Sequence, residues 1–186
     1  SYNASDLIDF DTSVKKLSGL SDVEYFVEPK FDGASIALLY ENDQLIRAAT
    51  RGNGVEGDNI TSNAKMIRSI PLSVPFSKHG IRKIELRGEV VIESGVFAQL
   101  NKERESQGLP LYNNPRNTAS GSLRIKDSGE VKKRNLDTFI YQIGFGEDTE
   151  GKNILESKLV SQSENIASLR EWGFKVPTQE AKVCKT

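Results

Sequence analysis

Residues 23–50 read VEYFVEPKFDGASIALLYENDQLIRAAT, with three β-rich stretches and a charged string after the first. The stretches cover residues 23–28, 35–41 and 44–50, and only Asn42-Asp43 joins the last two. Such a pair is typical of the tight turn between two antiparallel strands. The sequence therefore predicts a β-hairpin here, preceded by a separate strand.

Hydrophobic spacing and end signals predict the elements around this hairpin. Helices are expected at residues 5–18, in a short segment through Asn63 and Ile67, at 94–107 and at 161–172, and further strands at 83–93 and 138–145. Ser5 or Asp6 is expected to cap the first helix and Ser94 the third, while Gly19, Gly108 and Gly173 follow three helix ends. The polar stretch 113–124 is not expected in the core. This irregular order favours an α+β fold with largely antiparallel sheets.

Length and composition indicate one soluble domain, because 186 residues with 37% hydrophobic content are enough to bury a core. The sequence has no run of eighteen apolar residues and no signal-peptide pattern at its start, so a cytoplasmic protein without a membrane segment is expected. We also expect it to be a monomer.

Rare residues and charge exclude some classes of site. A lone Cys184 and a lone His79 can form neither an internal disulfide nor a Cys/His zinc site, so a metal would need oxygen ligands. His79 is expected on the surface and Cys184 in a strand near the chain end. The net charge of −1 argues against a protein that coats phosphates, although basic residues cluster at 82–87 and 116–134.

Glu28, Lys30 and Asp32 are two residues apart, so an extended backbone would point all three to one face. An ion-pair ladder on a solvent face is the plainer interpretation, and a nucleophilic lysine in a cleft is the functional one. A lysine attacks phosphorus only as the neutral amine, although its ordinary pKa is about 10.4. Because the two carboxylates stabilise the ammonium form, this chemistry requires Mg²⁺ or arginines such as Arg51 and Arg116 to offset them.

Lys30-Phe-Asp-Gly33 resembles the K-x-D-G motif of covalent nucleotidyltransferases, and further motifs narrow the resemblance to bacterial NAD-dependent DNA ligases. The supporting motifs are Glu28-Pro-Lys-Phe-Asp-Gly33, Ala49-Thr-Arg-Gly-Asn-Gly54, Ile67-Arg-Ser-Ile-Pro71, Leu86-Arg-Gly-Glu-Val90, Asn114-Pro-Arg-Asn-Thr-Ala-Ser-Gly-Ser-Leu-Arg124 and Lys133-Arg-Asn-Leu-Asp137. The resemblance covers nearly the whole chain. It implies a nucleotidyltransferase (ATP-grasp-like) fold of largely antiparallel sheets flanked by helices.

The resemblance also implies roles for individual residues. Lys30 would attack the α-phosphate of NAD⁺, release nicotinamide mononucleotide and carry AMP, and Asp32 would assist through the lysine proton or Mg²⁺. The remaining implied roles are Glu28 beside the adenine amino group, Glu89 at the ribose hydroxyls, Arg51 near the nucleotide, Tyr141 stacked on adenine, and Arg116 and Arg124 on the phosphates of nicked double-stranded DNA. No residue is predicted as a dedicated metal ligand.

The same resemblance implies that residues 1–186 are part of an adenylation domain. The domain that binds nicotinamide mononucleotide is not recognised in the sequence, nor are the oligonucleotide-binding, zinc-finger, helix-hairpin-helix and BRCT domains. A fragment that binds NAD⁺ weakly, adenylates itself poorly and cannot seal nicks alone is therefore expected. Two other interpretations stay open: a covalent nucleotidyltransferase that uses ATP or GTP, and a non-catalytic DNA-binding remnant.

Overall fold

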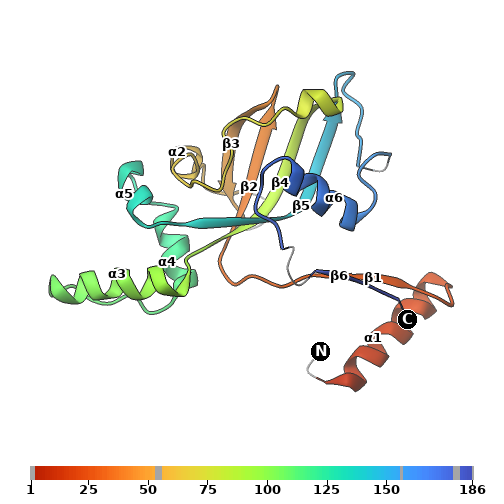
Figure 1. The fold of residues 1–186 in the computed structure, drawn as a ribbon, viewed down its shortest axis with the longest axis horizontal. Helices are drawn as coiled ribbons and strands as arrows, with labels where there is room; N and C mark the ends of the chain where they lie inside the picture. Colours follow the sequence, from red (N-terminus) through yellow and green to blue (C-terminus); the bar gives the residue numbers. More distant parts are fainter. Residues whose placement is uncertain (1–2, 53–55, 156, 178–180, 186) are drawn as a thin grey trace. The chain divides into compact units, whose positions relative to one another are not determined.

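A computed structural model describes residues 3–52, 56–155, 157–177 and 181–185 of the chain (Figure 1). In chain order its elements are α1 (Ala4–Ser18), β1 (Glu24–Val27), β2 (Ala34–Glu41), β3 (Gln44–Thr50), α2 (Thr61–Ala64), η1 (Phe76–His79), β4 (Ile81–Val91), α3 (Ser94–Ser106), α4 (Pro115–Ser122), α5 (Ser128–Lys133), β5 (Asp137–Asp148), α6 (Gln162–Glu171) and β6 (Lys182–Lys185). Helices and antiparallel sheets are mixed, which confirms the α+β class. The chain divides into two compact units, Ser1–Pro29 with Gln179–Thr186, and Lys30–Thr178.

The first unit consists of helix α1 and a two-stranded antiparallel sheet of β1 and β6. The Tyr25 hydroxyl of β1 donates a 2.9 Å hydrogen bond to Asp11 of the helix. The predicted caps of this helix, Ser5 or Asp6, were wrong, because Asn3 accepts the backbone N–H of Asp6 at 2.9 Å. Gly19 ends the helix with a φ of 73°, as predicted. Cys184 lies in β6, also as predicted.

The second unit is built on a four-stranded antiparallel sheet in the order β3-β2-β4-β5. The predicted hairpin forms its centre, and Asn42 and Asp43 make the turn with φ values of 49° and 67°. Asn and Asp tolerate this left-handed conformation better than most residues do, which explains why the two strands can be joined so tightly. The outer strand β5 begins and ends beyond the predicted range of 138–145.

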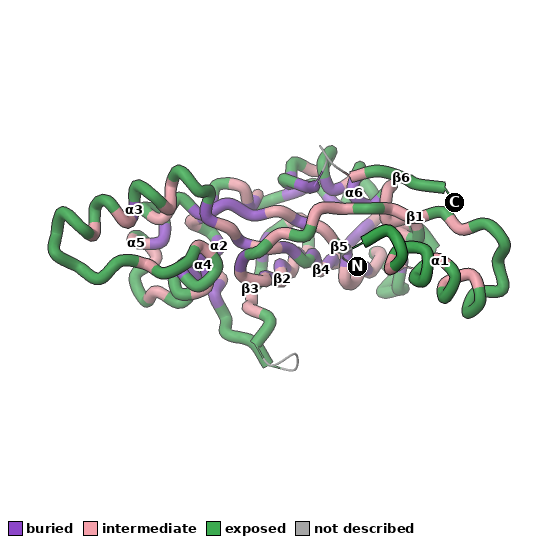
Figure 2. The backbone as a smooth tube through the Cα atoms, turned by 90° about the horizontal axis from the view of Figure 1, so that it is seen from below, coloured by how far each residue is buried: buried purple, intermediate pink, exposed green. Residues whose placement is uncertain are grey.

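One face of this sheet carries the core. Leu38 and Tyr40 of β2 and Ile84 and Leu86 of β4 are fully buried there. Helix α6, whose Leu169 is also buried, packs on β5. Figure 2 shows buried residues concentrated along these strands, whereas α1 of the first unit has none. The opposite face of the sheet carries Ser35, Glu89 and other polar side chains described below.

Both outer strands of the sheet bond to chain segments outside it. Beyond β3, Asn59 forms a bridge with Ala49, and the backbone N–H of Leu45 donates to Leu72 at 2.9 Å. Beyond β5, the N–H of Ile140 donates to the carbonyl of Lys175 at 2.8 Å. The sheet therefore continues into irregular backbone at both sides.

Residues 113–124 depart most from their prediction. Pro115–Ser122 form α4, which Asn114 caps by accepting from the N–H of Asn117 at 2.7 Å. Thr118, Ala119 and Ser122 are buried, so the expectation that this stretch lies outside the core was wrong. Small side chains let the helix approach β2 and β4 closely, and the Thr118 and Ser122 hydroxyls bond to carbonyls one turn earlier.

Smaller corrections concern the start of one helix and the end of another. Glu93, not Ser94, precedes α3 as its N-cap, and no side chain caps that helix end. Helix α2 stops at Ala64 and gives way to turns through Ile67. His79 is exposed, as predicted, with its ring 5.5 Å from that of Trp172. Among the residues that the structure describes, no helix has the length and apolar character needed to cross a bilayer.

Candidate active site

The segment that carries Lys30 and Asp32 is not a strand. β1 ends at Val27 and β2 begins at Ala34, so the expectation that Glu28, Lys30 and Asp32 share one face of a strand was wrong. Both Lys30 and Asp32 are exposed. Glu28 is half-buried and belongs to the first unit.

Two neighbouring residues fix this segment to the sheet. The Phe31 ring stacks on Phe139 of β5, with centroids 4.2 Å apart and the planes within 10°. Gly33 lies so close to β4 that a Cβ atom there would be 2.2 Å from the carbonyl oxygen of Val90. The main chain on both sides of Asp32 is therefore held against β4 and β5, while the Lys30 and Asp32 side chains extend into solvent.

Asp32 is paired with Arg116, whose Nη1 lies 3.1 Å from its Oδ1. Both side chains are open to solvent, at 74% and 62% exposure, so the pair adds little to stability. The pair does, however, bring together two of the residues that the sequence predicts for the site.

Glu89, Ser35 and Tyr141 form a second group, on the polar face of the sheet. Ser35 lies directly opposite Glu89 in the β2/β4 register, and its hydroxyl donates to Glu89 Oε2 at 3.0 Å. In the β4/β5 register, Arg87 faces Gln142 while Gly88 faces Ile140, so Tyr141 is the extra residue of a β-bulge. Bulges redirect side chains and are common beside active sites.

The environment of Tyr141 shifts the pKa of its hydroxyl upward, further from neutral pH. Burial raises the pKa of Tyr141, and the negative charge of Glu89 raises it further. A hydrogen bond with Ser35 and the positive charges of Arg51 and Arg87 act in the opposite direction but do not cancel the effect. A neutral, half-buried phenol ring of this kind is suited to contact a flat apolar ligand surface.

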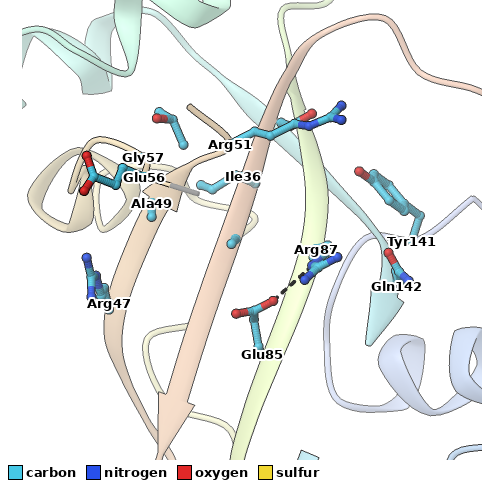
Figure 3. Close-up of a pocket in the computed structure, with 13 residues that line it drawn as sticks. Ile36, Arg47, Ala49, Arg51, Glu56, Gly57, Glu85, Arg87, Tyr141 and Gln142 are labelled. Atoms are coloured by element: carbon cyan, nitrogen blue, oxygen red, sulfur yellow. Dashed lines mark hydrogen bonds and ion pairs between the residues drawn. The ribbon is translucent and has the colours of Figure 1, made fainter. Parts of the chain in front are cut away.

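A cavity of about 870 Å³ opens on this face (Figure 3). Its lining residues come from β2, β3, β4, β5 and the loop after β3: Ser35, Ile36, Ala37, Arg47, Ala49, Thr50, Arg51, Glu56, Gly57, Glu85, Arg87, Tyr141 and Gln142. Figure 3 shows the Arg51 side chain reaching from the end of β3 across β2. Of the predicted site residues in the described chain, Arg51 and Tyr141 line the cavity, whereas Lys30, Asp32 and Glu89 do not.

The sequence prediction missed seven charged or polar residues of this cavity: Ser35, Arg47, Thr50, Glu56, Glu85, Arg87 and Gln142. Arg87 Nε pairs with Glu85 Oε1 at 3.0 Å, and the pair lies over Gly144, where any Cβ would come within 2.8 Å of both side chains. The alternation of Glu85, Arg87 and Glu89 at two-residue spacing was the available signal, because it places all three on one face of a strand.

Arg124 lies just after α4 and beside a different cavity. Its Nε donates to Asp58 Oδ2 at 2.7 Å and its Nη1 to Ser120 Oγ at 2.8 Å. The cavity, of about 570 Å³, is lined by residues 58–63 and 123–126. The structure thus separates Arg116, which pairs with Asp32, from Arg124, which pairs with Asp58. Residues 53–55 of the predicted glycine loop lie outside the described residues.

Comparison with known proteins shows which protein family contains this sequence. Over residues 1–186 the sequence matches the family described as NAD-dependent DNA ligase adenylation domain. The chain belongs to this family. The match includes every motif quoted above, so the K-x-D-G resemblance of Lys30 to Gly33 reflects membership of the ligase adenylation-domain family.

Relatives named DNA ligase occur in several bacteria. The chain is 54% identical over 184 residues to the protein of Sulfurihydrogenibium sp. strain YO3AOP1, 50% over 185 residues to that of Persephonella marina and 47% over 184 residues to that of Aquifex aeolicus. These alignments cover 99–100% of the chain but only 25–26% of each relative. The chain therefore spans about a quarter of the length of these ligases.

The described residues contain no ready-made metal centre. No three His, Cys, Asp or Glu side chains in this part of the chain gather closely enough to hold a metal ion. Mg²⁺ in nucleotide enzymes is commonly held by one or two carboxylates together with substrate phosphates. The exposed carboxylate of Asp32 fits such a site, which would be completed by a bound nucleotide.

Proposed function

We propose that this chain is part of the adenylation domain of an NAD-dependent DNA ligase and that Lys30 accepts AMP. The observation that supports this most directly is the fixed Lys30–Gly33 segment next to a polar sheet face with a cavity. Arg51 and Tyr141 of the cavity lining and Glu89, which Ser35 contacts, supply a cation, an aromatic ring and a carboxylate on that face. A nucleotide offers a phosphate, a ribose and a base to match them.

In the proposed reaction the neutral amine of Lys30 attacks the adenylyl phosphorus of NAD⁺. A phosphorus–nitrogen bond forms, the bond to the bridging oxygen breaks, and nicotinamide mononucleotide leaves with that oxygen, while the amine proton is lost. Arg116 assists by pairing with Asp32, because its positive charge offsets the negative charge of that carboxylate. Mg²⁺, held by Asp32, would supply further positive charge when bound.

The proposed binding roles are those that the family resemblance implies, and the residues of the sheet face support them. Tyr141 stacks on adenine, Glu89 accepts hydrogen bonds from the ribose hydroxyls while Ser35 orients it, and Arg51 contacts the phosphates. Glu28 is assigned to the adenine amino group by the family resemblance alone. The polar sheet face and the preceding K-x-D-G segment support the nucleotidyltransferase fold.

Nicked DNA is the proposed acceptor of the AMP. Arg116 and Arg124 are exposed guanidinium groups at the two ends of α4, and arginine binds phosphate through paired hydrogen bonds. In the whole protein AMP would pass from Lys30 to the 5′-phosphate at the nick, and the nick would then be sealed. Sealing is assigned to the whole ligase, of which this chain spans part.

Mass spectrometry of the chain after incubation with NAD⁺ and Mg²⁺ tests the proposal. We expect a small fraction of the protein to gain the mass of one adenylyl group, and Lys30→Ala to abolish that gain. Lys102→Ala, which removes an exposed lysine of α3, is the matched control and should be adenylated like the wild type. An adenylyl group that persists in Lys30→Ala, or labelling by ATP in place of NAD⁺, would contradict the proposal.

A further inference from the structure

The loop that follows β3 borders both cavities of the second unit. Arg51, Glu56 and Gly57 line the larger cavity on the sheet face, whereas Asp58 and Asn59 line the smaller one. Gly57 and Asp58, which are adjacent in the chain, therefore line different cavities. None of the roles assigned above involves Asp58.

The backbone of Asp58 is closely tied to the end of β3. The N–H of Thr50 donates to the Asp58 carbonyl at 3.0 Å, and the N–H of Asp58 donates to the Thr50 hydroxyl at 3.0 Å. Gly57 approaches so closely that a Cβ there would be 1.8 Å from the Thr50 carbonyl oxygen. A displacement of Asp58 would therefore move Thr50 and Gly57, both of which line the larger cavity.

The side chain of Asp58 points the other way, to Arg124, with a 2.7 Å hydrogen bond from Arg124 Nε. The backbone around Arg124 is itself fixed, because the buried amide of Asn63 donates to the carbonyls of Leu123 at 2.7 Å and Ile125 at 2.8 Å. The guanidinium is thus held at the smaller cavity by Asp58 and by Ser120. Lys126 adds a second cation to the lining of that cavity.

We propose that Asp58 is a positioning residue that couples nucleotide binding in the larger cavity to phosphate binding at Arg124; this inference rests on the proposed function. A DNA phosphate that binds Arg124 competes with Asp58 for the guanidinium, so Asp58 loses the cation that neutralises it. The carboxylate, now without its cation and one residue from Gly57 in the lining of the larger cavity, then repels an anionic nucleotide bound there. Nicked DNA should therefore weaken NAD⁺ binding, and by thermodynamic reciprocity NAD⁺ should weaken DNA binding to the same degree.

The Asp58–Arg124 pair is well suited to this exchange. Both side chains are about half exposed, with 60% and 48% of their surface open, so the pair can be broken by a competing phosphate and contributes little to folding. Removing the charge of Asp58 should accordingly leave the fold intact. A change in coupling without a change in stability separates this role from a structural one.

The test compares NAD⁺ affinity with and without nicked duplex DNA at low salt, by NMR titration of the chain. In the wild type we expect DNA to weaken NAD⁺ binding by about 5-fold or more, the lower end of typical couplings between sites. We also expect NAD⁺ to shift the Arg124 Nε–H resonance. In Asp58→Asn the coupling factor should fall toward 1, while NAD⁺ still shifts the backbone amides of Arg51 and Gly57.

Two further variants complete the experiment. Arg124→Lys keeps the charge but loses the Nε–H donor, and should reduce the coupling as Asp58→Asn does. Glu150→Gln breaks a comparably exposed pair with Lys152 that borders neither cavity, and should behave like the wild type. The spectra of all variants show directly whether each is folded.

The outcomes separate the two proposals. If NAD⁺ shifts no amide of the larger cavity in the wild type, the proposed function is overturned. If NAD⁺ binds but leaves Arg124 unaffected, if DNA does not perturb Arg124, or if the coupling is the same in Asp58→Asn, the role of Asp58 is overturned and the proposed function stands.

Discussion

Gly33 shows how the absence of a side chain can position a reactive residue. The main chain passes β4 so closely at this point that only a hydrogen atom fits beneath the Val90 carbonyl. Together with the Phe31–Phe139 stack, this contact determines where the backbone of Asp32 lies and limits where Lys30 can reach. The close approach to β4 therefore explains, on steric grounds, why this fold has a glycine at the last position of the K-x-D-G motif.

Replacing Gly33 with alanine should destabilise the protein by about 1–3 kcal/mol, because the new methyl group would overlap the backbone of β4. Chemical denaturation monitored by circular dichroism measures the change. Gly95→Ala is the control, since nothing lies within 4 Å of the added Cβ and α3 should gain up to about 1 kcal/mol. Equal stability of the two variants would show that the space between Gly33 and β4 can accommodate a methyl group.

A second prediction at the scale of residues concerns the contribution of Tyr141 to NAD⁺ binding. Removing the ring in Tyr141→Ala should weaken NAD⁺ binding by about 5- to 150-fold, because stacking of a base on an aromatic ring contributes about 1–3 kcal/mol. Tyr141→Phe keeps the ring and should bind nearly as well as the wild type in calorimetric titration. A loss of affinity in Tyr141→Phe equal to that in Tyr141→Ala would assign the contribution to the hydroxyl.

At the scale of elements, α4 is the unexpected feature. Its sequence is polar, yet Ala119 has no exposed surface and the helix packs on β2 and β4. The helix positions Arg116 at its first turn and Arg124 just beyond its last. Small residues are thus needed on the inward side so that the two arginines can pair with Asp32 and Asp58.

A larger side chain at the contact between α4 and the sheet should destabilise the protein. Ala119→Leu is expected to lower the free energy of unfolding by about 1–3 kcal/mol, as overpacking does in dense cores. Gly121→Ala on the exposed side of the same helix, where a Cβ meets nothing within 4 Å, should raise it by up to about 1 kcal/mol. Thermal unfolding of both variants provides the measurement, and a neutral Ala119→Leu would mean that the helix can move away from the sheet.

The elements that periodicity governs were predicted well from sequence. The β2–β3 hairpin, α6 and the Gly19 helix end were all expected, because hydrophobic alternation and turn residues are local signals. The site was harder to predict. The Lys30 segment leaves the strand conformation because of Phe31 and Gly33 contacts with residues more than 50 positions away, and no local pattern records those contacts.

The bulge at Tyr141 is a second example. A bulge depends on how β5 pairs with β4, so the side chain that it redirects cannot be identified from the β5 sequence alone. The pairs that Arg116 and Arg124 make with Asp32 and Asp58 depend likewise on where α4 packs. Motif resemblance supplied the residue types of the site, whereas their partners came from the fold.

At the scale of the whole molecule, Asp137 connects distant segments of the second unit. Its carboxylate pairs with Lys175 and accepts the backbone N–H of Thr138, which also donates to Ser69 at 2.9 Å. Burial alone would raise the pKa of Asp137, but hydrogen bonds from Lys175, Ser69 and Thr138 outweigh it, so the pKa lies below its ordinary value of 3.8. The charged form is therefore favoured in the folded state.

This lowered pKa predicts how stability depends on pH. Because Asp137 binds protons less readily when folded than when unfolded, its contribution is complete above pH 3.8 and is lost as the pH falls through the lower, folded value. Asp137→Asn should cost about 1–3 kcal/mol at pH 7 and make the loss of stability in acid less steep. Urea unfolding between pH 7 and pH 2 measures both effects. Asp22→Asn, at an exposed aspartate, is the control, and an unchanged acid profile in Asp137→Asn would assign the dependence to other carboxylates.

The irregular backbone beyond β3 and β5 has a consequence for the protein in a crowded solution. Outer strands of a sheet can recruit a strand from a neighbouring molecule, which is a common first step of aggregation. Here Asn59 and Leu72 bond to β3 and Lys175 bonds to β5, so the intramolecular partners already use hydrogen-bonding groups that an incoming strand would need. The same segments that carry Asp58 and help to hold Asp137 thus shield the sheet from self-association.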